Sequence, residues 1–99
     1  MIQHFVCFKF KPDTSQVEIQ KHMEMFASLE EKISQITSYR GGKVLEGFEG
    51  AEKYDTAHYV TFANKSDVDI YFYHEAHQEF IESNKNIWAD ILVIDSEIQ

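Results

Sequence analysis

Residues 2–10 alternate in the manner of a β-strand. Their sequence, IQHFVCFKF, places His4 with apolar side chains on one face and Phe5 and Cys7 on the other. A strand with apolar side chains on both faces has to be covered on both. The pattern therefore predicts a strand that lies inside a layered structure.

A helical periodicity begins shortly after Pro12. Ser15, with Glu18 three positions later, forms a capping box, which satisfies the first free amides of a helix. Apolar residues then recur at spacings of three and four and predict one helix over residues 15–33. We expect this stripe to belong to the core and to serve also as a pocket wall; it consists of Ile19, Met23, Phe26, Leu29 and Ile33.

Two further strands are predicted in the middle of the chain, over residues 38–48 and 56–62. Gly41 and Gly42 interrupt the first of them, which is typical of a bulge or of a close approach to the backbone. A polar turn over residues 46–53 joins the two strands.

The last third of the chain repeats the helix-then-strand order. Ser66 and Asp69 have the capping pattern and predict a helix that starts there. Residues 75–83 continue this helix or form a second short one. Residues 88–95 (WADILVID) predict a closing strand, in which Trp88 is expected to be core or pocket wall.

The order of these elements, β-α-β-β-α-β, predicts an α+β fold of the ferredoxin-like type, in one domain over residues 1–99. Both helices then cover one face of a four-stranded sheet, and the other face is bare. Phe5, Cys7 and Tyr59 lie on that bare face. Such an apolar face is an interaction surface, so we expect two sheets to pack face to face in a closed homodimer.

Charge and cysteine content narrow the possible partners. Seventeen acidic and nine basic residues give a net charge of −8, which repels phosphate backbones and anionic membrane surfaces, so we expect neither nucleic acid nor a membrane as partner. The single cysteine, Cys7, has no internal disulfide partner. Without an apolar run long enough to span a bilayer, and without the layout of a secretory signal, the sequence favours a cytoplasmic protein.

Residues 71–77, YFYHEAH, hold two of the five histidines and two of the five tyrosines. Histidine titrates near neutrality and suits a general base, and a tyrosine hydroxyl in a low-dielectric pocket stabilises an oxyanion. Tyr71 and His77 are six positions apart, so they converge only if the helix is kinked between them. His4 and His58 lie on strand faces that should meet the helices, where a buried imidazole needs a hydrogen-bond partner.

Several short motifs are spread over nearly the whole chain. They are H-x-x-x-F-K-F-K from His4 to Lys11, Leu29, Gly42, V-x-F from Val60 to Phe62, and Y-x-x-H-x-A-H at 71–77 followed by Phe80. In this order and spacing they resemble the stress-responsive dimeric α/β barrel (Dabb) family. Glu75 departs from the family's H-P-x-H motif, which has a proline at that position.

The resemblance implies a fold and a possible reaction. The family includes plant polyketide cyclases of the olivetolic acid type, which close a linear poly-β-ketone by aldol chemistry without metal or organic cofactor. It implies His77 as base, Tyr71 as oxyanion partner and His4 as polar support. A further pocket histidine of those enzymes falls on Thr56, and His58 lies two residues on, on the same strand face. The expected partner is a small hydrophobic or enolisable ligand.

Other interpretations stay open at this point. The chain is alternatively a non-catalytic stress-associated dimer, or a protein that binds a small ligand without converting it. A metal site would use His74 and His77 with His4 or His58 and a nearby glutamate, but HEAH lacks the H-E-x-x-H spacing of zinc peptidases. A haem site would need an axial histidine that no spacing singles out. We expect neither metal nor cofactor, and place His22 and His74 at the surface.

Overall fold

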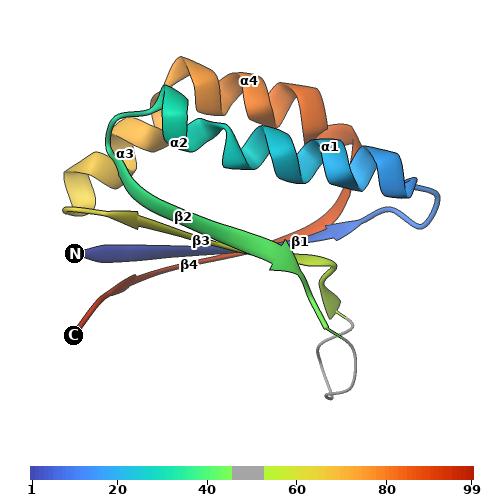
Figure 1. Ribbon diagram of the computed structural model, residues 1–99, viewed down its shortest axis with the longest axis horizontal. Helices are drawn as coiled ribbons and strands as arrows, with labels where there is room; N and C mark the ends of the chain where they lie inside the picture. Colours follow the sequence, from blue (N-terminus) through green and yellow to red (C-terminus); the bar gives the residue numbers. More distant parts are fainter. Residues whose placement is uncertain (46–52) are drawn as a thin grey trace.

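The computed structural model describes residues 1–45 and 53–99, and its core is a four-stranded antiparallel sheet (Figure 1). The strands follow the order β2-β3-β1-β4 across the sheet. The predicted turn over residues 46–53 lies almost wholly outside the described residues. The strands are β1 (Ile2–Phe10), β2 (Ile36–Lys43), β3 (Thr56–Phe62) and β4 (Trp88–Glu97).

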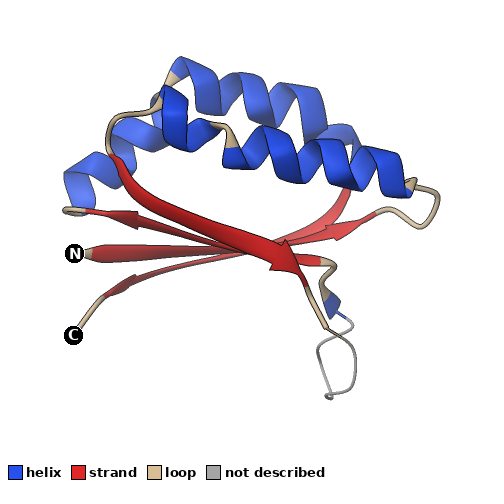
Figure 2. Cartoon of the chain, in the orientation of Figure 1, coloured by secondary structure: helices blue, strands red, loops and turns tan. Residues whose placement is uncertain are grey.

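All the α-helices cover the same face of this sheet (Figure 2). With the strands they give the β-α-β-β-α-β order of a ferredoxin-like fold, as the sequence predicts. The helices are α1 (Gln16–Ala27), α2 (Leu29–Lys32), α3 (Lys65–Tyr73) and α4 (Glu75–Asn84), and a 3-10 turn, η2 (Lys85–Ile87), leads into β4.

The prediction of one helix over residues 15–33 is wrong in one respect. The capping box at Ser15 and Glu18 is present, with both hydrogen bonds at 3.1 Å. The helix, however, breaks at Ser28, whose hydroxyl donates to the carbonyl of Met25 at 2.7 Å. A serine hydroxyl that bonds to its own helix backbone competes with the helical pattern, and α2 starts anew after it.

The predicted start of α3 at Ser66 is also wrong, because another side chain caps the helix. Asn64 accepts a hydrogen bond from the backbone of Asp67 at 2.9 Å, so α3 begins at Lys65. Helices α3 and α4 are separate elements. His74 has extended backbone (ψ 139°), which ends α3, and its Nδ1 accepts from the amide of Ala76 at 3.0 Å, which caps α4.

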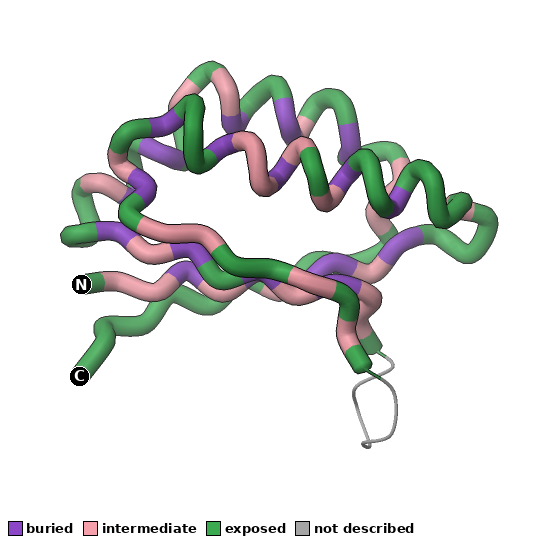
Figure 3. Tube along the Cα trace, in the orientation of Figure 1, coloured by how far each residue is buried: buried purple, intermediate pink, exposed green. Residues whose placement is uncertain are grey.

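Burial follows the two-layer arrangement (Figure 3). The side chains of β1 and β3 that face the helices are mostly buried, and His4 and His58 are among them, as predicted. On the opposite face, Phe5 and Tyr59 lie side by side with ring centroids 5.0 Å apart, and Tyr59 is 43% exposed. The sheet therefore has one face in the core and one apolar face without helices.

Candidate functional site

A cleft of about 410 Å³ lies between the β1–β4 side of the sheet and the helices α3 and α4. Helix α3 supplies Tyr71 and helix α4 supplies His77, and the break at His74 turns the two helices so that both rings face the same space. Five of the eight site residues predicted from sequence line this cleft: His4, Phe26, Tyr71, His77 and Trp88.

Tyr71 occupies the centre of the polar part of the cleft. Its ring centroid lies 4.4 Å from that of His77 and 5.5 Å from that of His4. The residue is 1% exposed, and within the described part of the chain its hydroxyl has no hydrogen-bond partner. Burial raises the pKa of Tyr71, so the group stays a protonated hydroxyl. It is a buried donor without an acceptor among the described residues.

His77 has one ring nitrogen, Nε2, without a hydrogen-bond partner among the described residues. Its Nδ1–H donates to the backbone carbonyl of Phe72 at 2.9 Å, because a carbonyl only accepts, and this leaves Nε2 without a proton. Burial lowers the pKa of His77, the charges of His4 and His74 lower it further, and the Phe72 carbonyl opposes them. The imidazole is therefore neutral at pH 7, which is the state that accepts a proton.

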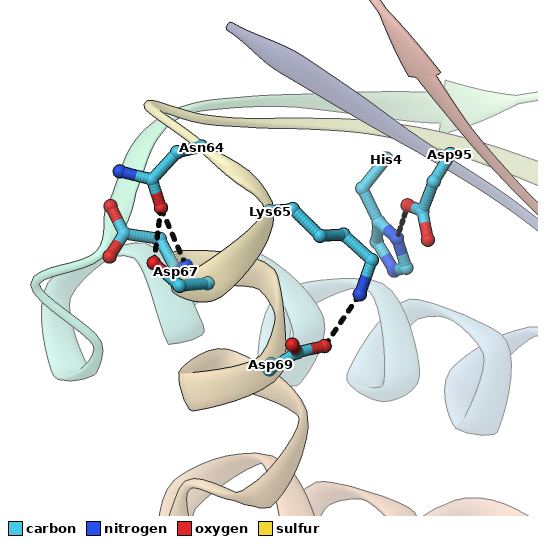
Figure 4. Close-up of polar contacts among 7 residues, drawn as sticks. His4, Asn64, Lys65, Asp67, Asp69 and Asp95 are labelled. Carbon is cyan, nitrogen blue, oxygen red and sulfur yellow. Dashed lines mark hydrogen bonds and ion pairs between the residues drawn. The ribbon is translucent and has the colours of Figure 1, made fainter.

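His4 is held by the carboxylate of Asp95, a residue that the sequence analysis does not predict as part of the site. Its Nδ1 lies 2.5 Å from Oδ1 of Asp95 (Figure 4), and because a carboxylate accepts, His4 donates from Nδ1. The two residues are directly paired in the β1–β4 register. Alternation alone places Asp95 on one face of its strand, but only the register puts it opposite His4.

One end of the cleft is charged. Lys65 forms an ion pair with Asp69 at 2.6 Å, and both residues line the cleft together with Asp95 (Figure 4). The opposite end is formed by aromatic side chains, among them Phe8 and Trp88. The cleft is therefore polar at one end and apolar at the other.

Three of the predicted binding residues do not line this cleft. Met23 is half-buried against the core. Thr56 and His58 are fully buried and belong to a hydrogen-bonded group in which His58 bonds to Tyr39 Oη at 2.7 Å and to Thr56 Oγ1 at 3.0 Å. Phe26 stacks on the imidazole at 4.6 Å. Burial lowers the pKa of His58 to about 4.

Gly41 leaves room for this group, which gives a testable prediction. A Cβ on Gly41 would lie 2.7 Å from His58 Nδ1 and closer still to Tyr39 Oη, whereas a Cβ on Gly42 would meet nothing within 4 Å. We expect Gly41→Ala to break the Tyr39–His58 hydrogen bond and to lower the free energy of unfolding by about 1–3 kcal/mol. Urea unfolding measures it, with Gly42→Ala as control; equal effects of the two substitutions would contradict this explanation.

His22 is buried, contrary to the prediction that it lies at the surface. It is 0% exposed, and its Nε2 accepts a hydrogen bond from Nε1 of Trp88 at 2.8 Å. The spacing in the sequence indicates this burial, since His22 lies three residues after Ile19 and four before Phe26, on the same helical stripe. Desolvation, with a smaller contribution from His58, lowers the pKa of His22 to about 3. His74, also placed at the surface, is half-buried as the cap of α4.

Comparison with known proteins identifies the family. The stress-responsive A/B barrel domain (Dabb) matches residues 2–98. The chain belongs to the Dabb family. None of the curated proteins matches it.

Solved structures of similar proteins agree with this assignment. The crystal structure of the Arabidopsis thaliana protein At3g17210 superposes with a TM-score of 0.92 at 25% identity, over 100% of this chain and 96% of the other. A hydroxynitrile lyase from Passiflora edulis gives 0.91 at 21% identity, over 99% and 93%. A protein from Bacteroides fragilis, described as dimeric, ferredoxin-like and of unknown function, gives 0.79 at 26%, over 98% and 95%.

Two further findings concern the described residues of this Dabb protein. Nowhere in residues 1–45 and 53–99 do three histidine, cysteine, aspartate or glutamate side chains gather in a way that could hold a metal ion. No helix in the same ranges is long and apolar enough to cross a membrane.

Proposed function

We propose that this Dabb protein performs cofactor-independent acid–base chemistry on a small enolisable ligand in the cleft, of the kind that closes a polyketide-like chain. His77 is the base, Tyr71 the oxyanion partner and His4 the polar support. The observation that carries the proposal is the Tyr71 hydroxyl, which is buried between two imidazoles and has no hydrogen-bond partner in the described part of the chain. An unmet buried hydroxyl costs about 1–3 kcal/mol, and a ligand oxygen bound there would remove that cost.

The reaction follows from the free atoms of the three side chains. Nε2 of His77 takes a proton from the carbon next to a carbonyl, and the enolate oxygen accepts a hydrogen bond from the Tyr71 hydroxyl. The enolate carbon then attacks a second carbonyl of the same molecule, and the new alkoxide takes the proton back from His77. His4, oriented by Asp95 through Nδ1, has Nε2 left for a hydrogen bond to a polar group of the ligand. The protons balance without any co-reactant.

Exchange of carbon-bound hydrogen tests the first step without knowledge of the natural substrate. In deuterated buffer at pH 7, the protein is expected to accelerate the loss of the α-proton signals of 4-phenyl-2-butanone, followed by proton NMR. Positioned general bases contribute about 10²–10⁴-fold. If the ketone binds and its exchange rate equals that of buffer, the acid–base role is excluded and a non-catalytic ligand binder is the better description.

We further propose that the protein is a homodimer through the sheet face without helices. Phe5 is paired in register with Tyr59 on one side and Ile94 on the other, so the three side chains share that face, and Ile94 is 49% exposed. Similar structures described as dimeric, such as that from Bacteroides fragilis, support this arrangement. Joining two such faces removes apolar surface from water.

A charge on this face is expected to separate the protomers. Ile94→Lys would bury an unpaired ammonium group in the interface, and we expect a shift from dimer to monomer in light scattering coupled to gel filtration. Val17→Lys, at an exposed apolar position on α1, is the matched control and should leave the mass unchanged. A dimeric Ile94→Lys variant would contradict this interface.

A further inference from the structure

We propose that Trp88, held by its hydrogen bond to the buried His22, forms the end wall of the cleft and limits the length of the ligand's apolar part. His22 is then a positioning residue that acts through Trp88. The inference rests on the proposed function only in taking the cleft as the ligand site; it requires no reaction there.

The cleft has a direction that places Trp88 at its far end from the charges. Along β1 the lining residues run from His4 to Phe8, which spans about 13 Å of extended chain. Asp95 lies opposite His4, at the polar end, and Trp88 lies next to Phe8, with ring centroids 5.1 Å apart. A ligand whose polar group lies at the Tyr71 hydroxyl therefore extends its apolar part toward Trp88.

Trp88 lies where the strand pairing is irregular, and a hydrogen bond to His22 holds its side chain in place. The residue opens β4 directly after η2, and its pairing with Phe10 lies at a register shift of the β1–β4 ladder. The indole is only half-buried, and in its present orientation Nε1–H donates to His22 Nε2 at 2.8 Å. Turning the indole elsewhere would leave a buried acceptor on His22 unmet, at a cost of about 1–3 kcal/mol.

His22 fits this role better than that of a core residue. Accepting at Nε2 fixes the proton of the neutral ring on Nδ1, and within the described residues Nδ1 has no partner. The ring lies edge-on against Phe8 and Phe10, at centroid distances of 4.5 and 4.9 Å, where an apolar side chain would pack without an unmet donor. Its hydrogen bond to Trp88 is the contact that an apolar residue could not make.

Trp88 is the only tryptophan of the chain, so its indole N–H signal in a nitrogen-correlated NMR spectrum reports on this bond alone. We expect His22→Phe, which keeps an aromatic ring but has no acceptor, to shift that signal and to speed its exchange with solvent at least tenfold. His22→Gln supplies an acceptor and is expected to restore slow exchange. Equal exchange in His22→Phe and in the unmodified protein would overturn the proposal.

A series of straight-chain 1-alkanols, which cannot enolise, then measures the depth of the cleft through shifts of the backbone amide signals of the lining residues, which every variant retains. In the unmodified protein and in His22→Gln, affinity is expected to rise about fourfold per methylene up to one chain length and then to stop. In His22→Phe and Trp88→Ala the rise should continue to longer chains. The same limiting length in all four proteins, or an indole signal that no alkanol shifts in the unmodified protein, would overturn the assignment of Trp88 as the end wall. If the ketone exchanges no faster than in buffer but the limiting alkanol length is still observed, only the proposed function is rejected.

Discussion

Replacing Tyr71 with phenylalanine is expected to slow the ketone exchange reaction about 10²–10³-fold, the usual effect of losing one oxyanion donor. The same change should leave the free energy of unfolding unchanged or raise it by about 1 kcal/mol. The reason is that the buried Tyr71 hydroxyl has no hydrogen-bond partner within residues 1–45 and 53–99, so its removal deletes an unmet polar group and leaves the ring in place. A hydroxyl retained for stability would give the opposite sign.

Tyr39→Phe is the matched control, because its hydroxyl is hydrogen-bonded to His58 at 2.7 Å. Removing this hydroxyl leaves Nδ1 of His58 without its partner, so we expect the free energy of unfolding to fall by about 1–3 kcal/mol. The rate of ketone exchange should not change. His77→Gln should abolish the acceleration, since an amide does not act as a base at pH 7. Urea unfolding and proton NMR measure both properties. A Tyr71→Phe variant that is destabilised like Tyr39→Phe and still active would rule out the oxyanion role.

The sequence predicts the first and third strands and their faces well, because alternation is a local property, whereas the strand predicted over residues 38–48 is Ile36–Lys43. Residues 2–10 and 56–62 are strands with the predicted bounds, and His4 and His58 face the helices as expected. Helix ends are predicted less well. Asn64 and Ser28 decide them through single side-chain hydrogen bonds, and several neighbouring polar residues compete for each such role.

The site is predictable only as far as local spacing and resemblance reach. The approach of Tyr71 and His77 depends on the extended backbone of His74, a tertiary detail that the spacing allows but does not require. Asp95 was missed because pairing across strands depends on register, which alternation does not determine. The prediction that His22 lies at the surface is wrong, because its place on the apolar stripe of α1 buries it despite its polarity.

Acid should destabilise this protein well before its carboxylates titrate. His22 and His58 are fully buried, and burial lowers their pKa values from 6.5 to about 3 and about 4. In the unfolded chain both regain ordinary values, so between pH 6 and pH 5 the unfolded state binds nearly two more protons than the folded state. Each such proton changes the free energy of unfolding by about 1.4 kcal/mol per pH unit. The two neutral histidines therefore make their full contribution to the free energy of unfolding above pH 6.5. Below that pH the free energy of unfolding falls by about 2–3 kcal/mol per pH unit.

Urea unfolding at pH 7, 6 and 5 measures this slope, and His22→Phe assigns it. The variant removes one of the two groups, so its stability should fall about half as steeply with acid, even if its stability at pH 7 differs. An unchanged slope would mean that His22 is already protonated in the folded state, which its hydrogen bond from Trp88 Nε1 forbids, because a protonated imidazole has no acceptor. The slope thus tests, by a route independent of any ligand, the neutral His22 on which the position of Trp88 depends.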